Sequence, residues 1–135
     1  MKHPDYNSPA ELKQVLDANG FSMQKKFGQN FLINEDARRR LVDALELTEG
    51  MKVWEVGPGL GAMTNTILER GADLTVFEID RGFASLISQF FEEYSSKNSF
   101  RIVEGDVLKT WKKKLESAGL PDRLLVTFHT TLQPQ

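Results

Sequence analysis

Apolar positions follow two different periods along most of this chain. Short β-branched or aromatic runs predict strands at 52–56, 73–79, 100–104 and 123–128. Between these runs, apolar residues recur at helical spacing over 60–70, 81–94 and 110–118. Strands that alternate with helices in this way predict a doubly wound, mainly parallel α/β sheet, with right-handed crossovers.

Start and stop signals predict two further helices ahead of the first strand. Ser8-Pro9-Ala10-Glu11 has the pattern of a capping box with proline at the first helical position, and Gly20 is a plausible stop. Asn34 is a candidate N-cap for the second helix. The residues expected to face inward from that helix are Ala37, Leu41, Val42 and Leu45.

Length and composition limit the classes of protein that this chain can represent. Its 135 residues have room for one domain, and a net charge of −2 gives no global sign of nucleic-acid binding. The absence of cysteine excludes disulfides, thiolate metal sites and a cysteine nucleophile, and His3 and His129 are too far apart in sequence to suggest a metal site. No apolar run is long enough for a transmembrane helix, and the polar start lacks the apolar core of a signal peptide, so a soluble cytoplasmic protein is expected.

The segment from Val53 to Gly61 carries the strongest local signal. An apolar run ends in Glu55, three glycines follow at alternate positions, and a helical pattern then begins. Open α/β sheets build nucleotide pockets from such a strand, turn and helix start. Gly57 and Gly59 can take positive φ and let a ligand approach the backbone, although glycines after a strand are also common in ordinary tight turns.

Acidic residues stand at the ends of the next two predicted strands. Glu78 lies 21 residues after Gly57, where a carboxylate can accept hydrogen bonds from both ribose hydroxyls of an adenosine. Asp106 could accept a hydrogen bond from the adenine amino group. Each alone has a plainer interpretation, since strand-end acids often cap helices, as Asp80 could do. Together at successive strand ends, they favour a nucleotide crevice.

Glu55 indicates which nucleotide the crevice would take. A carboxylate beside the glycine turn would repel a pyrophosphate, whereas it suits a ligand that carries an ammonium and a sulfonium group. The short Gly57-x-Gly59-x-Gly61 spacing also differs from the longer glycine pattern common in NAD sites. Both features favour S-adenosylmethionine over NAD.

Four motifs together resemble the ribosomal RNA adenine dimethyltransferases. They are Phe27-Gly28-Gln29-Asn30-Phe31-Leu32, Glu55-Val56-Gly57-Pro58-Gly59, Glu78-Ile79-Asp80 and Gly105-Asp106-Val107. The resemblance covers about residues 20 to 125 and is nearest to the bacterial small-subunit type, which methylates two adjacent adenosines. It implies a Rossmann-like S-adenosylmethionine-dependent methyltransferase fold that is incomplete at the C-terminus.

The resemblance also implies roles for individual residues. Those implied to bind S-adenosylmethionine are Gln29, Asn30, Leu32, Glu55, Gly57, Gly59, Glu78 and Asp106. Lys25 and Lys26 would contact the RNA backbone. The implied partner is small-subunit ribosomal RNA in an immature small subunit. We expect a monomer with no metal and no membrane association.

The chain departs from the family where the reaction itself would take place. The family transfers a methyl group from the sulfonium to adenine N6, twice, and holds the base with an Asn-Leu-Pro-Tyr segment after the fourth strand. After Leu125, this chain instead reads Val126-Thr127-Phe128-His129, and the family's C-terminal helical domain is absent. We therefore divide the chain into an N-terminal helical and basic segment (1–34), a partial methyltransferase core (35–125) and an aberrant tail (126–135). Negligible methyl transfer is expected.

Three other functions remain open from the residues. A large-subunit adenine methyltransferase of the antibiotic-resistance type shares the same motifs. A non-catalytic RNA-binding or ribosome-assembly factor could keep the cofactor fold without turnover. A nicotinamide-dependent oxidoreductase is a more distant alternative, which a titration with NADH against S-adenosylmethionine would separate.

The tail is compatible with a shifted reading frame. One stretch of DNA can encode Val-Thr-Phe-His-Thr-Thr-Leu, as in 126–132, and Gly-Asn-Leu-Pro-Tyr-Asn-Ile when read one base earlier. We expect sequencing of the coding DNA to reveal the second frame in the codons for residues 125–132. Codons that cannot yield Asn-Leu-Pro-Tyr in any frame contradict this hypothesis.

Overall fold

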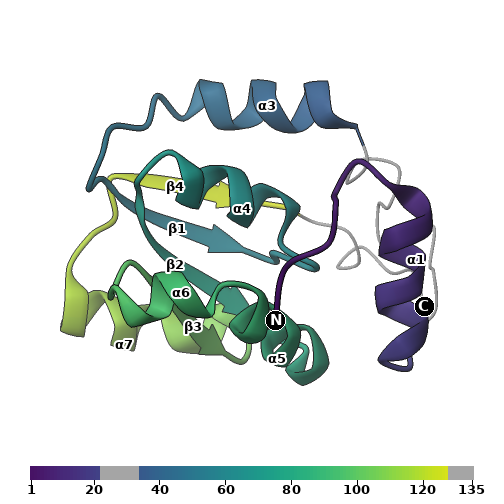
Figure 1. Ribbon diagram of the computed structural model, residues 1–135. Helices are drawn as coiled ribbons and strands as arrows, with labels where there is room; N and C mark the ends of the chain where they lie inside the picture. Colours follow the sequence, from purple (N-terminus) through teal and green to yellow (C-terminus); the bar gives the residue numbers. More distant parts are fainter. Residues whose placement is uncertain (22–33, 128–135) are drawn as a thin grey trace, which may run out of the picture.

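The computed structural model of the protein describes residues 1–21 and 34–127. In chain order, the helices and strands of this part are α1 (Pro9–Ala18), α3 (Glu35–Ala44), β1 (Lys52–Val56), α4 (Ala62–Glu69), β2 (Asp73–Glu78), α5 (Arg81–Phe90), α6 (Glu92–Ser96), β3 (Phe100–Glu104), α7 (Val107–Ala118) and β4 (Arg123–Val126) (Figure 1). None of the helices in these two ranges is long and apolar enough to cross a membrane.

The strands form one parallel sheet, which confirms the predicted fold class. Their order among the described residues is β3-β2-β1-β4, and Val53 of β1 pairs with Leu74 on one side and Arg123 on the other. The chain moves outward from β1 to β3 and then returns to the far side of β1. The strand order therefore reverses between β1 and β4, and the carboxyl ends of strands at such a switch point commonly hold the ligand.

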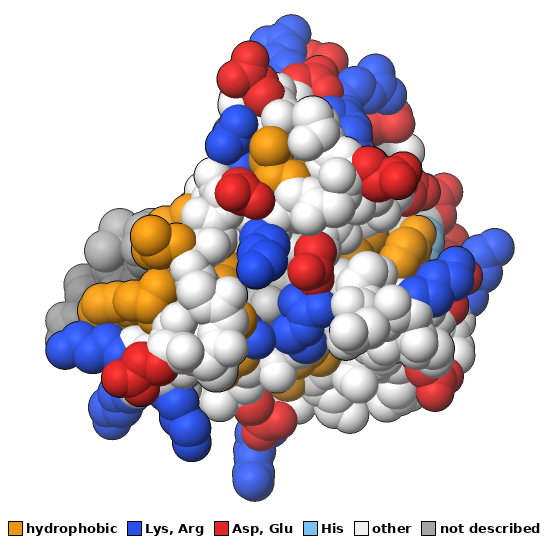
Figure 2. Space-filling view, turned by 90° about the vertical axis from the view of Figure 1, so that its left-hand side faces the viewer, with side chains coloured by type: hydrophobic (Ala, Val, Ile, Leu, Met, Phe, Trp, Pro, Cys, Tyr) orange, Lys and Arg blue, Asp and Glu red, His pale blue; other side chains and the backbone are white. Residues whose placement is uncertain are grey.

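The two faces of the sheet are covered unequally. Val53 and Val76 share the face against α4 and α5, which Figure 1 draws in front of the sheet, and neither is exposed. The opposite face carries α7, where Lys52 Nζ donates to Ala118 O at 3.5 Å. This second face is partly open, since Leu124 on β4 is 54% exposed. Figure 2, which looks at the end where the strands begin, shows hydrophobic side chains gathered along one edge beside the undescribed residues.

The N-terminal part of the chain completes the core. Tyr6, Leu12 and Leu16 are buried and belong to the same hydrophobic cluster as the front face of the sheet. Helix α1 lies beyond the carboxyl ends of the strands (Figure 1). Phe21, just after α1, stacks on Phe83 of α5 with ring centroids 4.5 Å apart. The described chain therefore enters 22–33 beside the carboxyl edge of the sheet.

Side-chain caps begin four of the helices, and three of these caps follow from the sequence. Ser8 Oγ accepts from Glu11 N, Asn34 Oδ1 accepts from Ala37 N, and Asp80 Oδ1 accepts from Phe83 N. Each satisfies an amide of the first turn that has no partner within the helix. The fourth cap is Asp106 on α7.

The inward face predicted for α3 is wrong at one position. Val42 is fully buried, but Leu41 is 36% exposed, and Arg38 is buried instead. The guanidinium of Arg38 donates to Asn7 Oδ1 in the N-terminal segment. Helix α3 packs against α4 and this polar segment rather than directly on the sheet, so a residue with a polar end takes the inward place.

Several predicted boundaries also need correction. The helix predicted over 81–94 ends at Phe90, and a separate α6 starts after Phe91 and includes Ser95 and Ser96. Phe91 is completely buried, with its ring against Phe100. This packing fixes Phe91 between the two helices, so that α5 ends before it and α6 begins after it. Helix α7 starts at Val107, not at 110, because Asp106 caps it. Strand β2 ends at Glu78 and β4 at Val126, and Phe128 lies outside the described residues.

Candidate functional site

Hydrogen bonds between adjacent strand ends bring the predicted crevice residues together. Gly57 N donates to Phe77 O at 3.0 Å, which ties the glycine turn to the end of β2. Gly105 N donates to Glu78 O at 2.9 Å, which ties the end of β2 to the residue before Asp106. These bonds place Gly57, Glu78 and Asp106 at one edge of the sheet, and that they line one ligand crevice there stays a prediction.

The glycine turn needs its unusual backbone for two different reasons. Gly57 has φ +76°, and a Cβ there would lie 2.9 Å from the carbonyl oxygen of Thr127. Gly59 has φ +58°, and a Cβ there would meet nothing within 4 Å. Gly57 is thus constrained by the close approach of the chain after β4. Gly59 borders open space in which a ligand could reach the backbone.

Glu78 joins the glycine turn to the end of β2 through its carboxylate. Its Oε1 accepts from Gly59 N at 3.3 Å and its Oε2 from Asp80 N at 2.9 Å, while only 6% of the residue is exposed. Burial raises the pKa of Glu78, and the hydrogen bonds from these backbone amides oppose that rise. Because the bond from Gly59 N is long, Glu78 Oε1 can also accept hydrogen bonds from the two hydroxyls of a ribose.

Asp106 has the plainer structural role that strand-end acids often have. Its Oδ1 accepts from Leu108 N at 2.9 Å and caps α7. A carboxylate has a second oxygen, so the cap is compatible with an additional bond to an amino group. Asp80 caps α5 in the same way, and no ligand role is needed to explain it.

Glu55 is not in the open crevice but beneath the turn, on the α4 side of the sheet. It is completely buried, and Thr64 Oγ1 of α4 donates to its Oε1 at 2.7 Å. Its Oε2 is buried with no hydrogen-bond partner in the described structure. Burial raises the pKa of Glu55 to about 7, the hydrogen bond from Thr64 opposes this rise, and the charge of Glu78 adds to it. An unpaired buried carboxylate oxygen is costly and favours a cationic group nearby.

Three further residues at this edge were not predicted as part of the site. Ile79 follows Glu78 and is 68% exposed, an apolar side chain beside two acids. Thr127 follows β4, and its hydroxyl donates to Gly57 O at 2.8 Å. Tyr6 donates to Leu60 O at 2.7 Å. An apolar residue between strand-end acids could have indicated Ile79, but nothing local in sequence connects Tyr6 or Thr127 to the turn.

Five predicted site residues lie outside the described part of the chain. They are Lys25, Lys26, Gln29, Asn30 and Leu32. The residues on either side are described, with Phe21 beside α5 and Asn34 at the start of α3. The cofactor and RNA roles implied for these five remain predictions.

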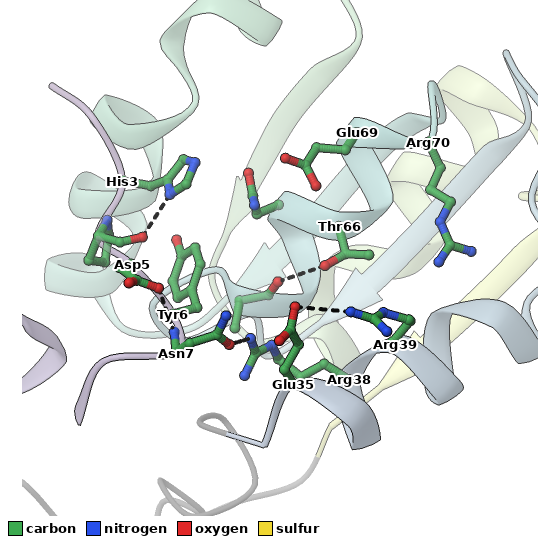
Figure 3. Close-up of a pocket in the computed structure, with 13 residues that line it drawn as sticks. His3, Asp5, Tyr6, Asn7, Glu35, Arg38, Arg39, Thr66, Glu69 and Arg70 are labelled. Atoms are coloured by element: carbon green, nitrogen blue, oxygen red, sulfur yellow. Dashed lines mark hydrogen bonds and ion pairs between the residues drawn. The ribbon is translucent and has the colours of Figure 1, made fainter.

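A groove of about 400 Å³ lies between the N-terminal segment, α3 and α4, and its lining does not include Gly57, Glu78 or Asp106. Its lining mixes charges of both signs, with Arg38 and Arg39 near Glu35, and with Glu69 at the end of α4 followed by Arg70 (Figure 3). It therefore has no strong preference for one sign of ligand. No cluster of metal-ligating side chains occurs within 1–21 and 34–127.

Curated relatives match most of this chain. It is 56% identical over 119 residues to the ribosomal RNA small subunit methyltransferase A of Treponema denticola, covering 88% of this chain and 40% of that protein. It is 44% identical over 108 residues to the protein of the same name in Treponema pallidum, covering 80% of this chain and 36% of that protein. The chain thus spans about two-fifths of the length of these relatives.

A solved structure agrees on the fold. The precorrin-6Y C5,15-methyltransferase of Geobacter metallireducens superposes with a TM-score of 0.57 at 15% identity, covering 73% of this chain and 50% of that one. At this identity the likeness concerns the fold alone. The sequence profile of the ribosomal RNA adenine dimethylase family matches residues 20–131. Because that match covers most of the chain, the protein belongs to the ribosomal RNA adenine dimethylase family.

Proposed function

We propose that this chain forms the S-adenosylmethionine-binding half of a ribosomal RNA adenine dimethyltransferase. The observation that carries the proposal is the bond between Glu78 and Gly59, which joins a strand-end carboxylate to a glycine turn at the edge of a parallel sheet. The family membership supports the same ligand class.

The described residues fit the three parts of this cofactor. Glu78 would accept hydrogen bonds from the ribose hydroxyls, and Asp106 from the adenine amino group. The exposed side chain of Ile79 offers an apolar surface for the flat face of the adenine. When it is ionised, Glu55, with its unpartnered Oε2, would place a negative charge beneath the turn, which suits the cationic methionine end. When bound, the cofactor would supply the methyl group.

The proposed substrate of the family's reaction is adenine N6 in small-subunit ribosomal RNA. The relatives from the two Treponema species carry that RNA subunit in their names. Lys25 and Lys26 would contact the RNA backbone, where positive charge positions a substrate without reading its sequence. We infer that dimethylation of two adjacent adenosines belongs to the full-length proteins, which act as cytoplasmic monomers on immature small subunits.

For this chain itself, we propose cofactor binding without methyl transfer. Adenine N6 is a weak nucleophile because its lone pair is delocalised into the ring. Catalysis therefore depends on acceptors for the N6 hydrogens and on a stacked base. Thr127 stands where the family begins its Asn-Leu-Pro-Tyr segment, and its hydroxyl donates to Gly57 O. A threonine turned toward the glycine turn does not supply the amide acceptor.

The first test is the affinity of Glu78→Gln for S-adenosylhomocysteine. The amide keeps an oxygen that can accept from Gly59 N but loses the charge that strengthens bonds from the ribose hydroxyls. We expect titration calorimetry to give a dissociation constant roughly 10- to 100-fold higher than that of the wild type. Glu104→Gln, at the exposed end of β3, is the matched control and should bind normally. Equal affinities for all three proteins contradict the assigned ribose site.

A second test uses the pH dependence of Glu55→Gln. The folded-state pKa of Glu55 is raised from 4.5 to about 7, so the folded chain binds the proton more tightly than the unfolded chain. The free energy of unfolding of the wild type should therefore fall as pH rises between these values, by at most roughly 3 kcal/mol. Urea denaturation at pH 5 and pH 8 should show this fall reduced in Glu55→Gln and unchanged in Glu104→Gln.

The affinity for the cofactor should depend on pH in the opposite direction to the stability, and Glu55→Gln tests this as well. The wild type should bind S-adenosylmethionine more tightly at pH 8 than at pH 5.5, because ionised Glu55 attracts the cationic ligand. Glu55→Gln should bind weakly at both pH values. A wild-type affinity that does not change with pH, together with normal binding by Glu55→Gln, removes Glu55 from the site.

A third test measures turnover. Immature small subunits and S-adenosylmethionine labelled with tritium in the methyl group should give negligible label on RNA with this chain, although it binds the cofactor. The full-length relative from Treponema denticola serves as the positive control. Turnover comparable to that control contradicts the proposal that the base-holding segment is missing.

A further inference from the structure

The N-terminal segment from His3 to Asn7 lies across the start of α4, far in sequence from the glycine turn that precedes this helix (Figure 3). Tyr6 is buried in this segment, as is Pro4, and 6% of the surface of Tyr6 is exposed. Its hydroxyl donates to the carbonyl oxygen of Leu60 at 2.7 Å. A residue outside the sheet therefore holds the backbone of the turn directly.

Leu60 occupies a sensitive position in that turn. The residue before it, Gly59, donates its N–H to Glu78. The residue after it, Gly61, provides the carbonyl that starts the hydrogen-bond ladder of α4 by accepting from Asn65 N at 2.9 Å. The carbonyl of Leu60 lies just before the ladder, where an unpaired buried acceptor would be costly. The hydrogen bond from Tyr6 therefore fixes the orientation of the Leu60–Gly61 peptide, which lies between the Gly59–Glu78 bond and the start of α4.

Packing around Gly61 indicates that the hydroxyl of Tyr6 is held in place. A Cβ on Gly61 would lie 2.7 Å from Phe91 Cε2 and 3.1 Å from Tyr6 Oη, so both side chains close over this backbone. The ring of His3 stacks on Tyr6 with centroids 5.3 Å apart and on Phe91 with centroids 5.8 Å apart. The aromatic group leaves Tyr6 little freedom to move away from Leu60.

Burial keeps Tyr6 a neutral donor, and its segment is anchored on two sides. Burial raises the pKa of the Tyr6 hydroxyl, and the negative charge of Glu55 beneath the turn raises it further. On the other side, Arg38 of α3 is buried and donates to Asn7 Oδ1 (Figure 3). The segment is therefore bound both to α3 and to the turn.

We infer that Tyr6 is a positioning residue for the cofactor: its hydroxyl fixes the Leu60 carbonyl and so presets the turn from Gly59 to Gly61 that receives S-adenosylmethionine. This rests on the proposed function, since it assigns Tyr6 to the same site. Without the bond, the turn has to be ordered when the ligand binds, and affinity falls by the cost of that ordering.

The experiment compares Tyr6→Phe with Tyr94→Phe, which removes a hydroxyl from the partly exposed tyrosine of α6. The dissociation constant for S-adenosylhomocysteine is measured by calorimetry at a temperature where thermal melts show all three proteins to be fully folded. Exchange of the amides over 57–65 is followed by mass spectrometry without ligand. For Tyr6→Phe, we expect roughly tenfold weaker binding and faster exchange over this peptide. Tyr94→Phe should match the wild type in both.

Each outcome bears on a different claim. If Tyr6→Phe melts at a lower temperature but binds as tightly as the wild type, Tyr6 has only a structural role and the inference fails. If the wild type does not bind the ligand, the proposed function fails. In that case, faster exchange in Tyr6→Phe still supports control of the turn by Tyr6, whereas unchanged exchange overturns that as well.

Discussion

The glycine turn after β1 lies over a buried carboxylate, and one oxygen of this carboxylate has no hydrogen-bond partner in the described structure. Glu55 stands on the central strand β1, has no exposed surface, and receives one hydrogen bond from the part of the chain that the structure describes, donated by Thr64 of α4. That bond joins the sheet to the first turn of the helix that follows the glycines. An apolar residue of similar size would cost the fold less. A buried acid with one unpaired oxygen is more readily explained by a ligand whose positive charge completes it.

Three separate contacts hold the turn above Glu55, two from the end of β2 and one from the N-terminal segment. The sheet holds Gly57 through Phe77 O, β2 holds Gly59 through the Glu78 carboxylate, and the N-terminal segment holds the carbonyl of Leu60 through Tyr6. A turn fixed at three successive points loses little freedom when a ligand binds, and this preorganisation is what a nucleotide site needs. The same contacts make the site depend on α1 and α3, which carry no ligand residues themselves but fix the segment that contains Tyr6.

Local pattern was sufficient to predict the sheet but not the orientation of every side chain. Strands β1 and β3 have the predicted bounds because continuous β-branched runs between turns admit few other structures, and Asn34 and Asp80 act as the predicted caps because a cap requires only its own first turn. The exposure of Leu41 and the break at Phe91 depend on neighbours that are distant in sequence, which periodicity does not contain. The site divides in the same way. Glu78 lies at the predicted strand end, whereas the donor for Leu60 O is 54 residues away, in a segment where nothing in the sequence indicated contact with the turn.

The geometry also supports our proposal that cofactor binding and base holding are separate in this chain. The contacts proposed for S-adenosylmethionine come from the ends of β1, β2 and β3, which are tied to one another by their own hydrogen bonds. The segment that would hold the adenine follows β4, across the switch point, and of this segment the structure describes Thr127, which packs against Gly57. A change in sequence after Leu125 therefore alters one wall of the crevice and leaves the hydrogen bonds of Glu55 and Glu78 in place. Tight cofactor binding by a chain without turnover is the state that this separation predicts.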